Sequence, residues 1–243
     1  KDLPDKVEKD IWLNFSPEEK QLYLANLAQV NEQLQQQLEL EQVDSILIIA
    51  MMTRLRQICC EPRMLYENYK GESTKFTMCL ELIETLKENG KKVLLFSSFT
   101  SIFDSFIEEF NQRGIKYHMI TGAVDKKKRK EEVDAFQSDD SDVFLISLKA
   151  GGTGLNLTKA QAVIHYDPWW NVSAQNQATD RAYRIGQTKN VLVYQLLMKN
   201  TIEAKIYEMQ KRKKEMSDIF VENSNGGIST LSKEELRDLF SME

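Results

Sequence analysis

Short apolar runs alternate with amphipathic stretches over most of this chain. Each run holds four or five mostly apolar residues, which is typical of a strand that is buried on both faces of a parallel sheet. These runs lie at residues 93–96, 117–120, 143–146, 162–166 and 191–194. The stretches between them have helical periodicity. The alternation predicts an α/β fold with five strands in a doubly wound parallel sheet flanked by helices.

The two ends of the chain lie outside this alternation. Residues 1–13 form a charged lead-in for which the pattern predicts no finished element. Ser16 and Pro17 suit the N-cap and first position of a helix, and the apolar run at 46–58 suits a returning helix. The Gln- and Glu-rich segment between them permits a coiled coil, but fewer than three heptads favour a protruding helical hairpin.

The carboxyl-terminal stretch is helical and charged. The pattern predicts a long helix at 202–220 that carries a basic run at 211–214. A loop follows at 223–227, and Ser232 begins a capping box for a last short helix.

Residues suited to chemistry concentrate between 143 and 187. A glycine turn at 150–154 lets the backbone approach a ligand closely, and D-P-W-W-N follows a strand at 167–171. The next segment is predicted to be a helix with Arg181 and Arg184 on one face, ended by Gly186. The order of strand, glycine turn, strand, loop and arginine helix predicts a sheet edge that presents cations to an anionic ligand.

These motifs resemble those of the Swi/Snf family of DNA-dependent ATPases, in helicase superfamily two. Residues 147–157 are similar to the family's fifth motif, 167–171 to its D-P-W-W-N box and 175–187 to its sixth motif. The segment at 55–62 is similar to the box that precedes its second lobe. The resemblance implies a carboxyl-terminal RecA-like lobe, and compact insertions and short connections favour a bacterial member.

The resemblance also implies a division of the chain into three parts. A linker and helical protrusion from the end of the first lobe are expected at 1–72, and the second RecA-like lobe at 73–200. Closing brace helices are expected at 201–243.

The function implied by the resemblance is that of a second motor lobe. The intact enzyme would hydrolyse ATP, translocate on duplex DNA and remodel protein–DNA complexes. A strand-separating DNA or RNA helicase lobe is one alternative, which the tryptophan box and the R-I-G-Q ending disfavour. A protein-docking module without catalysis is another, which the two arginines disfavour.

The resemblance assigns catalysis to Arg181 and Arg184 as arginine fingers. Arginine is the residue that stabilises charge on a γ-phosphate during its transfer. Without the surrounding motif, two solvated helix arginines, with Asp180 paired to Arg184, would be the ordinary interpretation.

Other site residues are likewise implied by their matching positions. Nucleotide contacts are expected from Gly152, Gly154 and Gln177. DNA-backbone contacts are expected from Ser97, Thr121, Gly122, Lys149, Trp170 and Asn171. A purely structural role is the alternative for the strand-end residues Ser97, Thr121 and Gly122. Tryptophans after a proline are most often packing residues, and this interpretation is kept for Trp169. Trp170 is expected to couple DNA binding to ATP turnover.

The sequence departs from the family pattern at five places, one of which is Glu61, where the family usually has histidine. Ser98 stands where the family often has glutamine, and this departure puts one DNA contact in doubt. Three other positions hold Thr121, Val172 and Tyr183 where the family has aspartate, proline and histidine, and these changes are tolerable.

Half of the implied active site is missing from the sequence. No G-K-[ST] motif and no acidic magnesium box occurs, so ATP and Mg²⁺ are expected to bind mainly to a first lobe that is not part of these residues. This piece alone is therefore expected to be inactive. The expected partners are double-stranded DNA, that first lobe and a DNA-bound protein.

Composition limits the remaining possibilities. The net charge of −5 means that DNA binding must come from a local patch. The three cysteines have no C-x-x-C spacing and two histidines lie far apart, so we expect reduced thiols and no metal site. No apolar run is long enough for a bilayer. We expect a soluble intracellular protein, in the cytoplasm near the nucleoid if bacterial and in the nucleus if eukaryotic.

Overall fold

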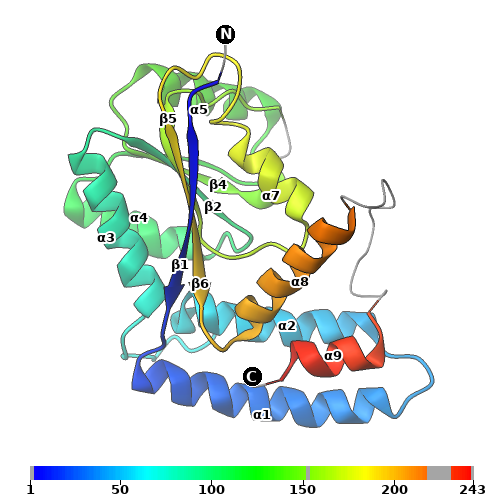
Figure 1. Ribbon diagram of the computed structural model, residues 1–243. Coiled ribbons are helices and arrows are strands. Elements are labelled where there is room, and N and C mark those ends of the chain that lie inside the picture. Colours follow the sequence, from blue (N-terminus) through cyan, green and yellow to red (C-terminus); the bar gives the residue numbers. More distant parts are fainter. Residues whose placement is uncertain (1–2, 152–153, 218–230, 242–243) are drawn as a thin grey trace. The chain divides into compact units, whose positions relative to one another are not determined.

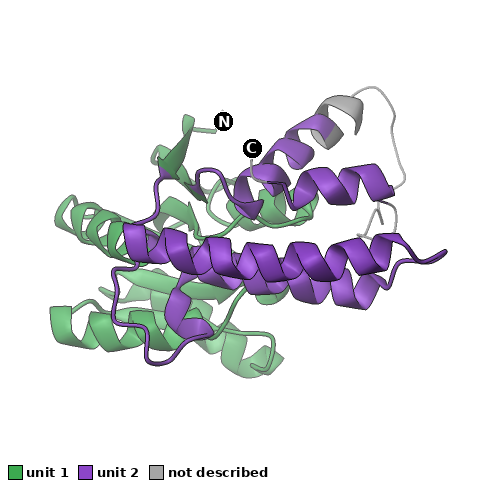
Figure 2. Cartoon of the chain, turned by 90° about the horizontal axis from the view of Figure 1, so that it is seen from below, with its two compact units in different colours: residues 1–12, 76–197 green, residues 13–75, 198–243 purple. Residues whose placement is uncertain are grey.

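The computed structural model describes residues 3–151, 154–217 and 231–241. The chain forms two compact units, which Figure 2 distinguishes by colour. The sheet unit comprises Lys1–Trp12 and Phe76–Leu197, and the helical unit comprises Leu13–Lys75 and Met198–Glu243. Each unit is therefore assembled from two segments that are distant in sequence. The predicted boundaries at 72 and 200 remain a prediction about the intact protein.

The sheet unit is built on a parallel sheet, which confirms the predicted fold class. Within the described residues the sheet has six strands in the order β1-β6-β5-β2-β4-β3. The strands are β1 (Lys6–Leu13), β2 (Lys92–Ser97), β3 (Tyr117–Ile120), β4 (Val143–Ser147), β5 (Ala160–His165) and β6 (Val191–Met198). The central strand β2 pairs with β4 on one side and β5 on the other, so the chain reverses its direction of travel across the sheet there. Such reversals are where ligands bind in open α/β sheets.

The first strand, β1, corrects the prediction that residues 1–13 contain no finished element. The strand lies beside β6, and the amide of Val191 donates to the carbonyl of Asp5 over 3.0 Å. Its first five residues are exposed, and several are charged. The sequence hid this strand because an edge strand can be held by backbone hydrogen bonds alone, and charged side chains protect such an edge from aggregation.

Helices cover both faces of this sheet (Figure 1). They are α3 (Thr74–Glu88), α4 (Ile102–Arg113), α5 (Lys126–Ser138), α6 (Leu148–Gly151) and α7 (Val172–Thr179). On one face, Phe106 of α4 packs against Phe76 and Tyr166. On the other, α5 and α7 share a buried cluster with the sheet residues Phe96 and Phe144.

The predicted arginine helix is wrong at its carboxyl end. Helix α7 stops at Thr179, so Arg181 and Arg184 lie in consecutive turns and do not share a helix face. The backbone amides of Ala182 and Tyr183 both donate to the carbonyl of Thr179, over 3.1 Å each. Gly186 has a positive φ of 105°, as a sharp turn requires, but it does not cap the helix.

The helical unit contains the expected hairpin of α1 (Pro17–Leu38) and α2 (Ser45–Cys60), with a short 3₁₀ turn η1 (Pro62–Met64) after it. The predicted N-cap of α1 is confirmed, because Ser16 and Glu19 form a capping box. The capping box at Ser232 is confirmed in α9 (Lys233–Leu239). The predicted helix at 202–220 appears as α8 (Ile202–Ser217), while the predicted loop at 223–227 lies outside the described residues.

A buried ion pair joins α8 to the first turn of α3 within the helical unit. The ammonium of Lys75 lies 2.5 and 2.6 Å from the two carboxylate oxygens of Glu203, and both side chains are fully buried. The amide of Met198 also donates to Glu203, over 3.0 Å. Burial opposes the charge of Lys75, but the Glu203 carboxylate together with the neighbouring Cys60 and Cys59 outweighs it, and the pKa of Lys75 is raised. The pairing therefore keeps a charge inside an otherwise apolar core.

The three cysteines are buried, and none of them forms a disulfide in the part of the chain that the structure describes. In the part of the chain that the structure describes, no helix is long and apolar enough to cross a membrane.

Candidate functional site

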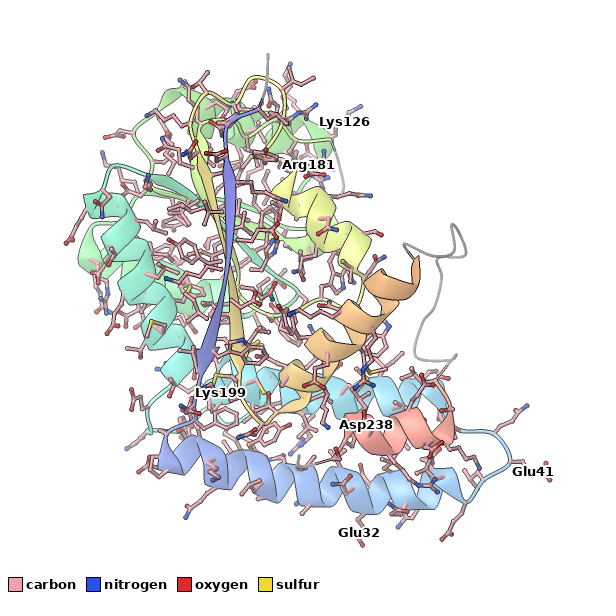
Figure 3. The ribbon with its side chains drawn as sticks, viewed as in Figure 1. Glu32, Glu41, Lys126, Arg181, Lys199 and Asp238 are labelled. Atoms are coloured by element: carbon pink, nitrogen blue, oxygen red, sulfur yellow. The ribbon has the colours of Figure 1, made fainter. Side chains whose placement is uncertain are left out.

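The chain from 180 to 187, which we term the arginine segment, is held against the chain that enters β5. The amide of Leu157 donates to the carbonyl of Arg181 over 3.0 Å. The guanidinium of Arg184 donates to the carbonyl of Leu155 over 3.3 Å. Figure 3 shows Arg181 just beyond the end of α7. Backbone contacts thus fix both arginines beside the segment that follows the glycine turn.

The two arginines are close enough to influence each other electrostatically. Burial lowers the pKa of Arg181, the neighbouring charge of Arg184 lowers it further, and Asp180 opposes the change. Arg181 is half-buried and Arg184 is exposed. Among the described residues Arg184 has no carboxylate within ion-pair distance, so the predicted alternative of an Asp180 pair is not formed. Two cations held together in this way suit an anionic ligand.

The buried side chain of Gln187 holds the arginine segment in place through hydrogen bonds to backbone groups. Its side-chain amide donates to the carbonyl of Ala160 over 2.9 Å and to that of Ala182 over 3.0 Å. Its side-chain oxygen accepts from the amides of Thr188 and Lys189. A buried glutamine therefore ties the segment to the first residue of β5 and satisfies backbone groups within the segment and directly after it.

The glycine turn follows β4 through the short helix α6. The hydroxyl of Ser147 accepts the amide of Ala150 over 3.3 Å, and Lys149 is exposed on this helix. Gly154 has a φ of 53°, and an added Cβ there would meet no atom within 4 Å. Gly154 is thus required by the backbone conformation, and its surface is open. Gly152 lies outside the described residues.

Asp167 is the centre of a hydrogen-bond cluster where β2 and β5 end. Its Oδ1 accepts from the hydroxyl of Ser97 over 2.7 Å and from the amide of Ser98 over 3.1 Å. Its Oδ2 accepts from the hydroxyl of Ser98. Asp167 and Ser97 are almost completely buried. We term these three residues the Asp167 cluster.

The tryptophan loop, residues 168–171, follows Asp167 directly. Trp169 packs against the buried cluster of the sheet, which supports the packing role expected for it. Its amide donates to the side chain of Gln175 over 3.2 Å, and Gln175 in turn donates to Gln195 of β6 over 2.5 Å. Trp170 is half-buried.

A family comparison identifies the fold that holds these residues. The model of the helicase conserved C-terminal domain matches residues 74–186. A solved structure of the SWI2/SNF2 ATPase C-terminal domain from Sulfolobus solfataricus superposes with a TM-score of 0.79 at 25% identity, covering 98% of this chain and all of that one. The chain belongs to the SWI2/SNF2 family and corresponds to the carboxyl-terminal lobe.

Longer relatives contain this SWI2/SNF2 lobe as one part. An ATP-dependent helicase of Mycoplasma pneumoniae is 38% identical over 99% of this chain, which spans 23% of that protein. A putative ATP-dependent helicase/translocase of Bacillus subtilis is 34% identical over 99% of this chain, which spans 26% of that protein. The SWI2/SNF2 ATPase core of Sulfolobus solfataricus in complex with dsDNA has a TM-score of 0.81 at 30% identity, covering 99% of this chain and 51% of that one.

The remaining predicted residues of the SWI2/SNF2 lobe lie at element ends. Thr121 is half-buried and Gly122 is exposed between β3 and α5. Asn171 caps α7, since its side chain accepts the amide of Ala174 over 3.3 Å, and Gln177 is exposed on that helix. Ser97 lies beneath the surface with its hydroxyl donated to Asp167, a placement that a strand-end position alone does not reveal.

His165 is a buried contact between the lobe's sheet and α7. Its Nε2 lies 2.8 Å from the hydroxyl oxygen of Thr179, the last residue of α7. Burial lowers the pKa of His165 to about 4, although Asp167 and Glu8 act in the opposite direction. The imidazole is therefore neutral at physiological pH and joins the end of β5 to the residue before the arginine segment.

Sequence reasoning missed Gln187, Asp167 and His165 as parts of the site. His165 and Asp167 are polar residues inside or next to an apolar run, and such a residue needs a partner when it is buried. That signal indicates burial but not the identity of the partner. No group of three or more potential metal ligands occurs in residues 3–151, 154–217 and 231–241.

Proposed function

We propose that this chain is the second motor lobe of a DNA-dependent ATPase that translocates on duplex DNA and remodels protein–DNA complexes. ATP and Mg²⁺ bind mainly to a first RecA-like lobe of the same protein, and this lobe completes the site. The proposal is supported by the Sulfolobus SWI2/SNF2 core, whose title names a complex with dsDNA and of which this chain matches 51%. The enzyme acts where the cell keeps its DNA, near the nucleoid in a bacterium or in the nucleus of a eukaryote.

The arrangement of Arg181 and Arg184 is the observation that carries the proposal. Both are held through backbone contacts to the chain after the glycine turn, and Arg184 keeps its charge exposed without a carboxylate partner in the described residues. Charges that are held in place before the reaction lower the barrier most when negative charge develops in the transition state. The two guanidinium groups act as arginine fingers on the γ-phosphate.

The other predicted residues have roles that suit their positions. Gly152, Gly154 and Gln177 contribute to the nucleotide site, where glycines let the backbone approach the phosphates. Thr121, Gly122, Lys149 and Asn171 contact the DNA backbone, together with the hydroxyl of Ser97 when the strand end opens. Such contacts position a duplex without reading its sequence. Trp170 links the bound duplex to turnover, because α7 connects its loop to the arginine segment.

The decisive experiment measures ATP turnover by the intact protein with and without duplex DNA. Arg184→Ala should lower duplex-stimulated kcat by a factor on the order of 10³, as loss of an arginine finger does in known NTPases. Duplex affinity and melting temperature should stay close to those of the parent, since Arg184 is exposed and has one long hydrogen bond at 3.3 Å. Normal turnover by this folded variant would remove the arginine-finger role.

Two controls accompany that measurement. Lys189→Ala removes another exposed cation five residues along the chain and should leave turnover unchanged. Residues 1–243 alone should hydrolyse no ATP and should bind duplex weakly at most, with an affinity that falls as salt rises, because a chain of net charge −5 offers few phosphate contacts. Robust hydrolysis by this chain alone would contradict the division of the site between two lobes.

A further inference from the structure

In the Asp167 cluster, both carboxylate oxygens of Asp167 accept hydrogen bonds. One carboxylate receives three hydrogen bonds from two consecutive residues, Ser97 and Ser98. Only 1% of Asp167 is exposed. A carboxylate buried to this degree costs free energy unless its oxygens are hydrogen-bonded, so the serine donors are what make the position tenable. Losing them would remove hydrogen bonds that stabilise this buried carboxylate.

The cluster joins the ends of two neighbouring strands. Ser97 is the last residue of β2, and β5 ends at His165, two residues before Asp167. Between them the amide of Tyr166 donates to the carbonyl of Phe96 over 2.9 Å, which extends the strand pairing by one bond. The Asp167 cluster then adds the last hydrogen bonds between the ends of these two strands. Beyond Asp167 the chain leaves the sheet, so the carboxylate is the last anchor before the tryptophan loop.

The tryptophan loop has a second anchor at its other end. Asn171 caps α7, and Gln175 of α7 accepts the amide of Trp169. Four residues are thus fixed from both sides, by the sheet through Asp167 and by α7 through Gln175. The position of Trp170 and the start of α7 are set together by these contacts.

We propose that Asp167, with Ser97 and Ser98, is a positioning residue that fixes the tryptophan loop and couples duplex binding to ATP turnover. The coupling part rests on the function proposed above. Asp167 touches neither nucleotide nor DNA. It holds Trp170 and the first turn of α7 in one geometry, and α7 leads directly to Arg181. Loosening the loop uncouples a bound duplex from the arginine segment, while the duplex still binds.

The positioning part is tested on residues 1–243 without any activity measurement. The chain has three tryptophans, Trp12, Trp169 and Trp170, so 5-fluorotryptophan labelling gives a three-line fluorine spectrum that single Trp→Phe variants assign. Asp167→Asn keeps the shape but replaces one acceptor by a donor that faces the serine hydroxyls. We expect the lines of Trp169 and Trp170 to shift or broaden and the line of Trp12 to stay.

A milder variant and a matched control protect this test from a folding failure. The double variant Ser97→Ala/Ser98→Ala removes two donors but leaves the amide of Ser98, and should change the same two lines less. Ser101→Ala removes an exposed hydroxyl that makes no capping bond in α4, and should change none. Unchanged lines of Trp169 and Trp170 in folded Asp167→Asn would overturn the positioning role.

The coupling part is tested on the intact protein. Asp167→Asn should lower duplex-stimulated kcat at least tenfold, with basal turnover and the duplex concentration for half-stimulation within about twofold of the parent. Trp170→Ala should show the same loss, and the two changes combined should lose no more than either alone. Full stimulation of Asp167→Asn, or additive losses, would overturn the coupling. A parent without any duplex stimulation would instead contradict the proposed function and leave the fluorine result to decide the positioning role.

Discussion

Two sets of charged residues in this protein have opposite surroundings. Lys75 and Glu203 in the helical unit are fully buried, and each satisfies the other over 2.5–2.6 Å. Arg181 and Arg184 in the sheet unit lie near each other, and burial together with the charge of Arg184 lowers the pKa of Arg181. One set cancels its charge inside a core, while the other accumulates it where a ligand can reach. Residue type alone therefore does not distinguish a structural charge from a functional one.

The difference follows from the cost of burying a charge. A buried ion pair is held by its own attraction, so removing one partner exposes the whole desolvation penalty of the other. Two like charges repel, and the fold tolerates Arg181 and Arg184 because Arg184 is exposed to water and backbone contacts hold both in place. A ligand that brings negative charge relieves this repulsion. Charge of one sign that is gathered where water can reach it is therefore the structural feature that favours a binding site.

The largest effect is expected from breaking the buried pair. Lys75→Met leaves the Glu203 carboxylate buried and should lower the free energy of unfolding by about 3–5 kcal/mol, measured by urea denaturation. The double variant Lys75→Met/Glu203→Leu removes both charges and should recover most of that loss.

The surface pair of Arg113 and Glu84 is the matched control for this experiment. Its atoms are 2.9 Å apart, but both side chains are more than a third exposed. Arg113→Met should cost less than about 1 kcal/mol. If Lys75→Met cost no more than Arg113→Met, the contrast between buried and exposed charge would fail.

A smaller effect is expected from acid, through His165. The pKa of His165 is about 4 in the folded protein, below the ordinary value of 6.5, so the unfolded chain binds the proton more readily. The free energy of unfolding should therefore fall by about 3 kcal/mol as pH decreases from about 6.5 to about 4. His165→Gln cannot titrate, and its unfolding free energy should lose that much less over the same range.

The comparison of the pH profiles of parent and variant isolates this residue. Every ionisable group other than His165 is common to both proteins, so its contribution cancels in the difference. The pKa of about 4 already includes the opposing contributions of Asp167 and Glu8, which favour the charged form of His165. Parallel profiles would show that His165 is not held neutral.

The smallest effect is expected at two helix caps. Ser16 and Ser232 each form a capping box, but only Ser16 is buried, and its partner Glu19 also accepts the amide and hydroxyl of Thr74. Ser16→Ala should cost about 1–2 kcal/mol of unfolding free energy, and Ser232→Ala about 0.5–1 kcal/mol. Thermal denaturation of the two variants measures the difference, and equal costs would mean that burial adds nothing to the cap.

Local patterns in the sequence determined most of the elements. The runs at 93–96 and 143–146 became strands because a continuous apolar run is stable only when both faces are covered. The capping boxes at Ser16 and Ser232 could be predicted from the sequence because donor and acceptor lie within one helical turn. The family motifs likewise placed the arginines, the glycine turn and the tryptophan loop in one lobe.

Tertiary structure decided what depends on partners distant in sequence. Strand β1 exists because β6 offers it a free edge, and α7 stops early because Gln187 and the chain at 155–157 bind the arginine segment. Ser97 is bonded to a carboxylate seventy residues away, and Lys75 to one at a separation of 128 residues. The sequence can show that such polar groups need partners, but only the folded chain determines which groups come within reach, because hydrogen bonds and ion pairs act over a few ångströms.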